Sequence, residues 1–248
     1  MNGQTFKVVA LGALALLITL GGARQPQAAD AKTQYPSMPP LNQYLMERTA
    51  EIALARSAAP PSISRDATVM ILGSHGYEAA VEGKNGFVCV VERGWMNPFD
   101  SPEFWSPKTR GALCFNPPAA RTVLPMTLMR TKLVLAGKSK AEVRASIKTA
   151  IENKELPGLE AGAMSYMMSK DAYLTDAGGH NMAHLMFYTP LMDGAVWGAN
   201  PVDSSNKLSV SFPGSPLLLA PLFNGNPEPI DVFLMETGMW SDGTAAPM

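Results

Sequence analysis

Short runs of apolar and β-branched residues, bounded by turn residues, predict strands in several segments of the chain. A run of β-branched and other apolar residues at Thr68–Leu72 predicts a buried strand. Residues 77–82 and 87–92 predict the two strands of a hairpin, because Lys84-Asn85-Gly86 between them contains the Asn-Gly pair that tight turns favour. Further strands are predicted at 113–115, 162–168, 183–188 and 230–236.

Helical periodicity marks three other segments. Residues 41–57 place apolar side chains at helical spacing, and Pro60-Pro61 ends the segment. A second helix is expected to open at Pro117-Pro118 and to run through Arg121 to Ala136, with a kink near Pro125. A third begins at Ser139, where Ser-Lys-Ala-Glu matches the S-x-x-E capping box. Together the patterns predict an α+β fold with a mainly antiparallel sheet, two or three helices and long loops rich in proline and glycine.

The first 31 residues have the pattern of a secretory signal peptide. Lys7 precedes the apolar run Val8–Leu20, and small residues follow, with cleavage expected after Ala29 or Ala31. The run covers about 20 Å as a helix, which is less than the roughly 30 Å hydrocarbon core of a bilayer. A cleaved signal is therefore favoured over an uncleaved membrane anchor, and residues 1–31 are left out of the fold.

The remaining chain predicts one domain. Residues 32–40 are a proline-rich lead-in, and residues 41–248 contain no internal repeat and no linker long enough to divide them. We therefore expect residues 41–248 to form a single globular α+β domain.

Charge narrows the classes of partner. The chain carries 20 Lys and Arg against 21 Asp and Glu, with no basic cluster. Nucleic acid and anionic membrane surfaces both require concentrated positive charge, so neither is expected as the main partner. No second apolar run approaches 18 residues, so no stable membrane span is expected after signal cleavage. The predicted location is secreted or periplasmic, and nothing in the sequence indicates an oligomeric state.

Cysteine usage agrees with export. Cys89 and Cys114 are the two cysteines, and each lies on a predicted strand. Disulfides persist in oxidising compartments, so we predict a Cys89–Cys114 disulfide, with two buried free thiols as the alternative. A metal-bound pair is less favoured, because the sequence has no C-x-x-C.

The three histidines, His75, His180 and His184, are the main candidates for chemistry. On a strand, His180, Met182, His184 and Met186 would share one face, because side chains alternate with a period of two. Imidazole and thioether ligands together suit copper or another late transition metal. His75 follows the first predicted strand and could supply a third imidazole if the strands are neighbours. The alternative is that the methionines fill the core and the histidines make local hydrogen bonds.

Three functions remain open at this point. The first is an exported protein that binds a small ligand or a metal ion at the histidine and methionine residues above. The second is an exported hydrolase with His180 or His184 as general base and a nearby aspartate, of which the sequence offers Asp171, Asp176 and Asp193. The third is a structural or interaction protein of the cell envelope. No H-E-x-x-H, C-x-x-C-H, P-loop or G-x-G-x-x-G motif is present, so catalytic and cofactor-binding residues stay unassigned.

Overall fold

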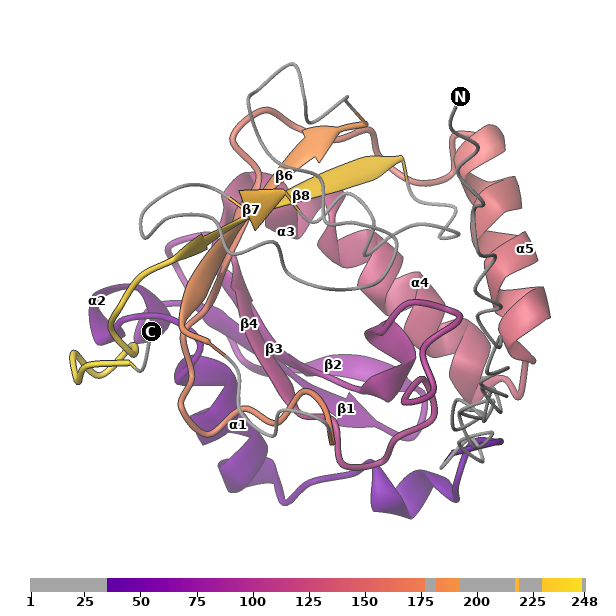
Figure 1. Ribbon diagram of the computed structural model, residues 1–248, viewed down its shortest axis with the longest axis horizontal. Coiled ribbons are helices and arrows are strands. Elements are labelled where there is room, and N and C mark those ends of the chain that lie inside the picture. The colour runs from indigo at the N-terminus through magenta and orange to yellow at the C-terminus, as the bar shows by residue number, and fades with distance from the viewer. Residues whose placement is uncertain (1–34, 177–181, 192–216, 219–228, 247–248) are drawn as a thin grey trace, which may run out of the picture. The chain divides into compact units, whose positions relative to one another are not determined.

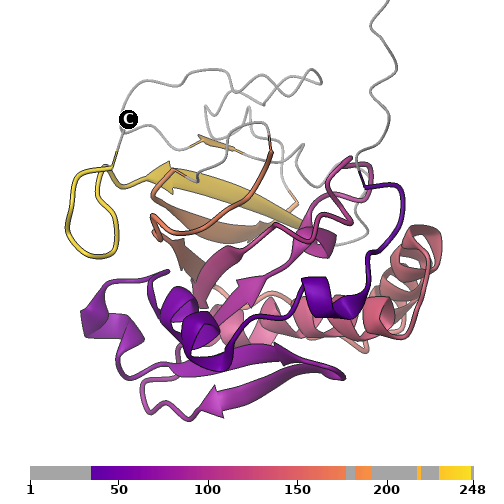
Figure 2. The ribbon, with the colours of Figure 1, turned by 90° about the horizontal axis from the view of Figure 1, so that it is seen from below.

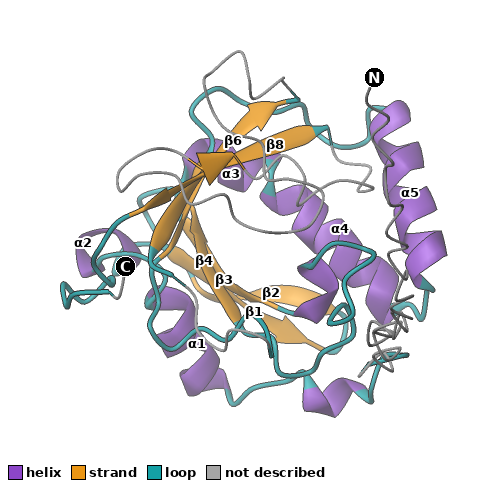
Figure 3. Cartoon of the chain, in the orientation of Figure 1, coloured by secondary structure: helices purple, strands orange, loops and turns teal. Residues whose placement is uncertain are grey.

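The computed structural model describes residues 35–176, 182–191, 217–218 and 229–246. These residues form an α+β domain with one mixed, mostly antiparallel sheet, as predicted (Figures 1 and 3). The predicted signal peptide and most of the chain between residues 189 and 229 lie outside the described residues. Within the described ranges, no helix has both the length and the apolar character needed to cross a membrane.

The described sheet has the strand order β2-β1-β3-β4-β5-β6-β8-β7. Only β1 and β3 pair in parallel among these neighbours, and the other pairs are antiparallel. The strands are β1 Thr68–Gly73, β2 Gly76–Val81, β3 Val88–Glu92, β4 Gly111–Phe115, β5 Met164–Met167, β6 His184–Pro190, β7 Leu217–Leu218 and β8 Ile230–Glu236.

The helices follow local sequence signals closely. The segment predicted to kink near Pro125 is divided into two helices at that point, because a proline cannot donate the backbone hydrogen bond that would continue the first. The predicted capping box at Ser139 is confirmed, with both of its hydrogen bonds present. The helix predicted over residues 41–57 is shorter than expected. The helices are α1 Arg48–Arg56, α2 Pro61–Ser64, α3 Pro117–Thr122, α4 Leu124–Leu135 and α5 Lys140–Glu152, with 3-10 turns η1 Leu41–Gln43 and η2 Gly94–Met96.

The predicted hairpin between residues 77–82 and 87–92 is wrong, although both segments are strands. β1 lies between β2 and β3, and β2 instead forms a hairpin with β1. The Asn85 side chain accepts a hydrogen bond from Phe87 N and donates one to Ile63 O, so it fixes a crossing loop rather than a tight turn. That loop passes the start of β1 so closely that a Cβ at Gly83 would lie 2.1 Å from Thr68 N.

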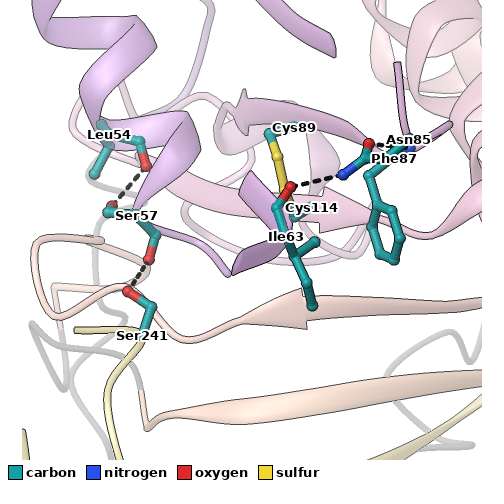
Figure 4. Close-up of a disulfide and its surroundings, with 8 residues drawn as sticks. All are labelled: Leu54, Ser57, Ile63, Asn85, Phe87, Cys89, Cys114 and Ser241. Carbon is teal, nitrogen blue, oxygen red and sulfur yellow. Dashed lines mark hydrogen bonds between the residues drawn. A yellow bond between two sulfur atoms is a disulfide. The ribbon is translucent and has the colours of Figure 1, made fainter. Parts of the chain in front are cut away.

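One face of the sheet packs against α1. Ala55 of α1 forms a core cluster with Val69, Val91 and the two cysteines, all of them buried. Cys89 and Cys114 lie directly opposite each other on β3 and β4, and the predicted disulfide is present (Figure 4). The side chains of α1 thus cover this face of β1, β3 and β4.

The other face packs against α3 and α4. Val90, Leu113 and Phe115 alternate with the residues of the first face and form a cluster with Ala119 and Leu124. α5 lies beside α4 (Figures 1 and 2). Strands β6 and β8 continue this face of the sheet beyond β5. A hollow lies between these two strands and α4.

Candidate functional site

The hollow is a cavity of about 120 Å³ walled by α4 and by strands β3, β4, β6 and β8. We call it the α4 cavity. Twelve of the described residues line it: eight are apolar, and the four polar ones are Glu92, Thr127, Arg130 and Tyr188. A cavity with a mostly apolar wall and a few convergent polar groups is typical of a small-molecule site.

Strand alternation sends Glu92 into this cavity. Glu92 ends β3, and it follows Val88 and Val90 at the positions that face α4. Its neighbour Arg93 faces the other way and is paired with Glu51 of α1. Two residues after Arg93, Trp95 is fully buried and donates a 3.0 Å hydrogen bond to Thr131 Oγ1, which ties this part of the chain to α4. The position of Glu92 is thus fixed from both sides.

The surroundings bring the pKa of the Glu92 carboxyl close to neutral pH. Burial raises its pKa to about 7, while a hydrogen bond from Thr127 and the charge of Arg130 act in the opposite direction. Thr127 Oγ1 donates to Glu92 Oε1 at 3.1 Å. Near neutral pH, Glu92 therefore exchanges between a carboxylate and a protonated form that can donate a hydrogen bond.

Arg130 is the cation of the α4 cavity. It is buried on α4, one turn beyond Thr127. Its guanidinium lies 4.0 Å from the ring centroid of Phe99 and donates to Met96 O at 3.4 Å and to Asn97 O at 3.2 Å. These contacts hold a positive charge beside an apolar space.

Tyr188 supplies the hydroxyl on the opposite wall. It lies on β6, and its hydroxyl is 2.8 Å from Ser165 Oγ on β5. Burial raises the pKa of Tyr188 above its usual value, and the negative charge of Glu92 raises it further. Tyr188 is therefore a neutral hydroxyl at all physiological pH values.

Replacing Glu92 by glutamine is expected to stabilise the protein above pH 7. Because the pKa of Glu92 is raised from 4.5 to about 7, the folded chain loses stability relative to the unfolded chain as pH rises through this interval. The loss reaches about 3 kcal/mol above pH 7. Urea unfolding at pH 4 and pH 8 should show nearly equal stability for wild type and Glu92→Gln at pH 4, and a more stable variant at pH 8. The exposed Glu82→Gln change is the control, and equal stability of all three proteins at pH 8 would contradict the prediction.

The predicted histidine site is divided by the topology. His75 lies exposed in the turn between β1 and β2, and His184 begins β6. Strands β3, β4 and β5 lie between β1 and β6, which corresponds to about 19 Å along the sheet at the usual strand spacing. The structure therefore places His75 and His184 apart. His180 lies outside the described residues, so its pairing with His184 stays a prediction.

His184 is buried, and its Nδ1 lies 2.7 Å from Met182 O. Burial lowers its pKa to about 4, although the hydrogen bond with Met182 acts in the opposite direction. The imidazole is thus neutral at physiological pH, with one nitrogen engaged by the backbone. Met186 shares its strand face, as predicted, and lines the α4 cavity. Among the described residues, no group of three or more His, Cys, Asp or Glu side chains is placed to hold a metal ion.

Of the two candidate aspartates that the structure describes, Asp176 has the more developed hydrogen-bond network. It accepts hydrogen bonds from Tyr173, Lys108 and Tyr35, which lower its pKa to about 2. These bonds anchor the loop before residue 177 rather than orient an imidazole. Asp171 is exposed in a turn, and Asp193 lies outside the described residues.

Sequence reasoning did not identify Glu92. A signal was available, because an acidic residue continues the Val88, Val90 series on the apolar face of a strand. An ionisable group at such a position is costly to bury and is a reason to look for function. Comparison with protein-family models, with curated proteins and with solved structures finds no match for this chain.

Proposed function

We propose that the protein is an exported binding protein that holds a small, mainly apolar ligand in the α4 cavity. The ligand would make its polar contact with Glu92, and the methionine, leucine and valine side chains of the wall would pack against the rest. This develops the small-ligand function expected from the sequence and moves its site from the histidines to the α4 cavity.

The observation that carries the proposal is the Glu92 carboxyl in a mostly apolar wall, with its pKa raised to about 7. Such a group lowers the stability of the fold at neutral pH, so a purely structural role does not explain it. Perturbed carboxyls in cavities are typical of functional sites. The size of the α4 cavity, about 120 Å³, is close to that of cavities known to bind a molecule such as benzene.

Export is part of the proposal. The predicted signal peptide and the buried disulfide both support an oxidising compartment outside the cytoplasm. A small ligand of that compartment could reach the cavity without crossing the inner membrane.

Methionine NMR provides a direct test, because Met96, Met126 and Met186 line the α4 cavity. In protein labelled at the methionine methyl carbons, hexanol should shift these three resonances and leave the exposed Met239 unchanged. Val123→Phe, which fills the cavity from its wall, should abolish the shifts while near-UV circular dichroism shows a folded protein. If hexanol shifts no cavity methyl in the wild type, or shifts them equally in Val123→Phe, the proposal is wrong.

The pKa of Glu92 also favours a second candidate, an enzyme that transfers protons on the bound ligand. General acids and bases work best when their pKa lies near the ambient pH. His184 is not favoured for this role, because a pKa of about 4 makes it a weak base. Consumption of the ligand by wild type but not by Glu92→Gln would distinguish catalysis from binding alone.

A further inference from the structure

A second hollow adjoins the α4 cavity. It has a volume of about 670 Å³ and runs from the end of α5, past Lys154 and residues 156–159, to the end of β6 and the start of β8. We call it the outer groove. Met126 and Ile230 belong to the walls of both hollows, so a molecule passing between these two side chains would occupy both. Methionine side chains are flexible, which suits a position where a passage must open.

The outer groove has the chemistry expected for a hydrocarbon chain. Apart from Lys154 and Gly158, the described residues of its wall are apolar side chains and prolines. Pro157, Pro190 and Pro229 have no backbone N–H, so these positions present no donor that would have to be satisfied. Each methylene group buried in such a place should strengthen binding about fourfold.

The charges around the two hollows favour an acidic partner. The charged wall residues are Glu92 and Arg130 in the α4 cavity and Lys154 in the outer groove. Among the wall residues that the structure describes, two cations face one carboxyl, so the charge of these residues is net positive whether Glu92 is protonated or not. Lys154 lies among apolar residues of the groove, whereas Arg130 lies beside Glu92 and Thr127, which places the polar end of a ligand in the cavity.

We propose that the α4 cavity and the outer groove form one site for a single-chain amphiphile with an acidic head group. The head group lies near Glu92 and Arg130, and the chain passes between Met126 and Ile230 into the outer groove. This inference rests on the proposed function and names its ligand class.

Protonation of Glu92 controls the affinity for such a head group. The groups that face Glu92 or lie near it are Thr127 and Arg130 from α4, Tyr188 from β6 and Tyr77 from β2. A protonated Glu92 donates a hydrogen bond to the acidic head group, and an ionised Glu92 repels it. Both tyrosines stay neutral because burial raises their pKa values, so Glu92 is the group that switches near pH 7.

Calorimetry with three ligands of equal chain length tests the head group: decanoate, decanol and decylamine. Decanoate should bind most tightly at pH 6, and its dissociation constant should rise about tenfold between pH 6 and pH 8. Decanol should show no such change, and decylamine should bind more weakly than decanol. In Glu92→Gln, decanoate should bind at pH 8 as tightly as at pH 6.

Chain length and one groove variant test the path of the chain. A Cβ at Gly158 meets no atom within 4 Å, so Gly158→Trp should fill the outer groove without disturbing the fold. It should weaken decanoate and leave hexanoate unchanged, whereas Glu155→Trp, at an exposed neighbour outside the groove wall, should affect neither. Equal affinities of decanoate and hexanoate in the wild type would overturn the role of the groove.

The outcomes separate this inference from the proposed function. If decanol binds as tightly as decanoate at pH 6, the acidic head group is wrong and the binding function stands. If none of the three ligands binds and hexanol also leaves the cavity methyls unchanged, both are wrong.

Discussion

Replacing Glu51 by alanine should lower the free energy of unfolding by about 3–5 kcal/mol, because it leaves a buried cation without its partner. Arg93 and Glu51 form an ion pair of 2.7 Å, and their side chains are 0% and 1% exposed. The same Glu51 oxygen accepts a hydrogen bond from Leu72 N at 3.1 Å, so the pair joins α1 to β1 and to the residue that follows β3. Arg110 is a second cation near the pair. Burial, and then the charge of Arg93, lower the pKa of Arg110 to about 10.

Urea unfolding of the variant measures the loss. The matched control is Glu160→Ala, which breaks the surface pair of Arg121 and Glu160, whose side chains are 59% and 43% exposed. That control should cost less than about 1 kcal/mol, because water already screens the charges. The double variant Glu51→Leu/Arg93→Met should recover most of the stability. Equal losses in Glu51→Ala and Glu160→Ala would contradict the structural role of the buried pair.

Removing the disulfide should have an effect of similar size. Cys89 and Cys114 are both fully buried and 25 residues apart in sequence. A cross-link that closes a loop of this length stabilises the folded state by about 3.5 kcal/mol, because it restricts the unfolded chain. The Cys89→Ala/Cys114→Ala variant should therefore unfold at a clearly lower urea concentration than the wild type.

Reductant provides the internal control for the disulfide. Dithiothreitol should lower the unfolding midpoint of the wild type towards that of the double variant and leave the double variant unchanged. Both sulfurs are buried against α1, so reduction should require unfolding and be slow under native conditions. A double variant as stable as the wild type would show that the cross-link adds nothing to the α1 face.

Local sequence signals predicted much of the fold. The capping box at Ser139 and the break at Pro125 depend on a few adjacent residues, and both appear where expected. The hairpin at Asn85 was wrong because pairing depends on the whole sheet: β1 takes the place beside β3 that the turn signal assigned to β2. Nothing local in residues 77–92 reports that a third strand inserts between the two.

The candidate site was harder to predict for the same reason. The chain has three histidines, and the chemical hypotheses rested on them. His75 lies in the turn after β1 and His184 begins β6, and the topology separates these two strands. Glu92, Arg130 and Tyr188 are ordinary residues in three distant segments, and only the packing of α4 across the sheet brings them to one cavity. The raised pKa of Glu92 is a property of that packing, not of any motif.

Titration of the Glu92 carboxyl carbon by NMR tests the central claim most directly. The side-chain carboxyl resonances of glutamate can be followed from pH 3 to pH 9, and Glu92→Gln identifies the one that belongs to Glu92. A midpoint near pH 7, which moves when hexanol is added, is the result expected for a functional carboxyl in a mostly apolar cavity. A midpoint near the ordinary glutamate value of about 4.3, unchanged by hexanol, would show a solvated carboxyl and contradict the site.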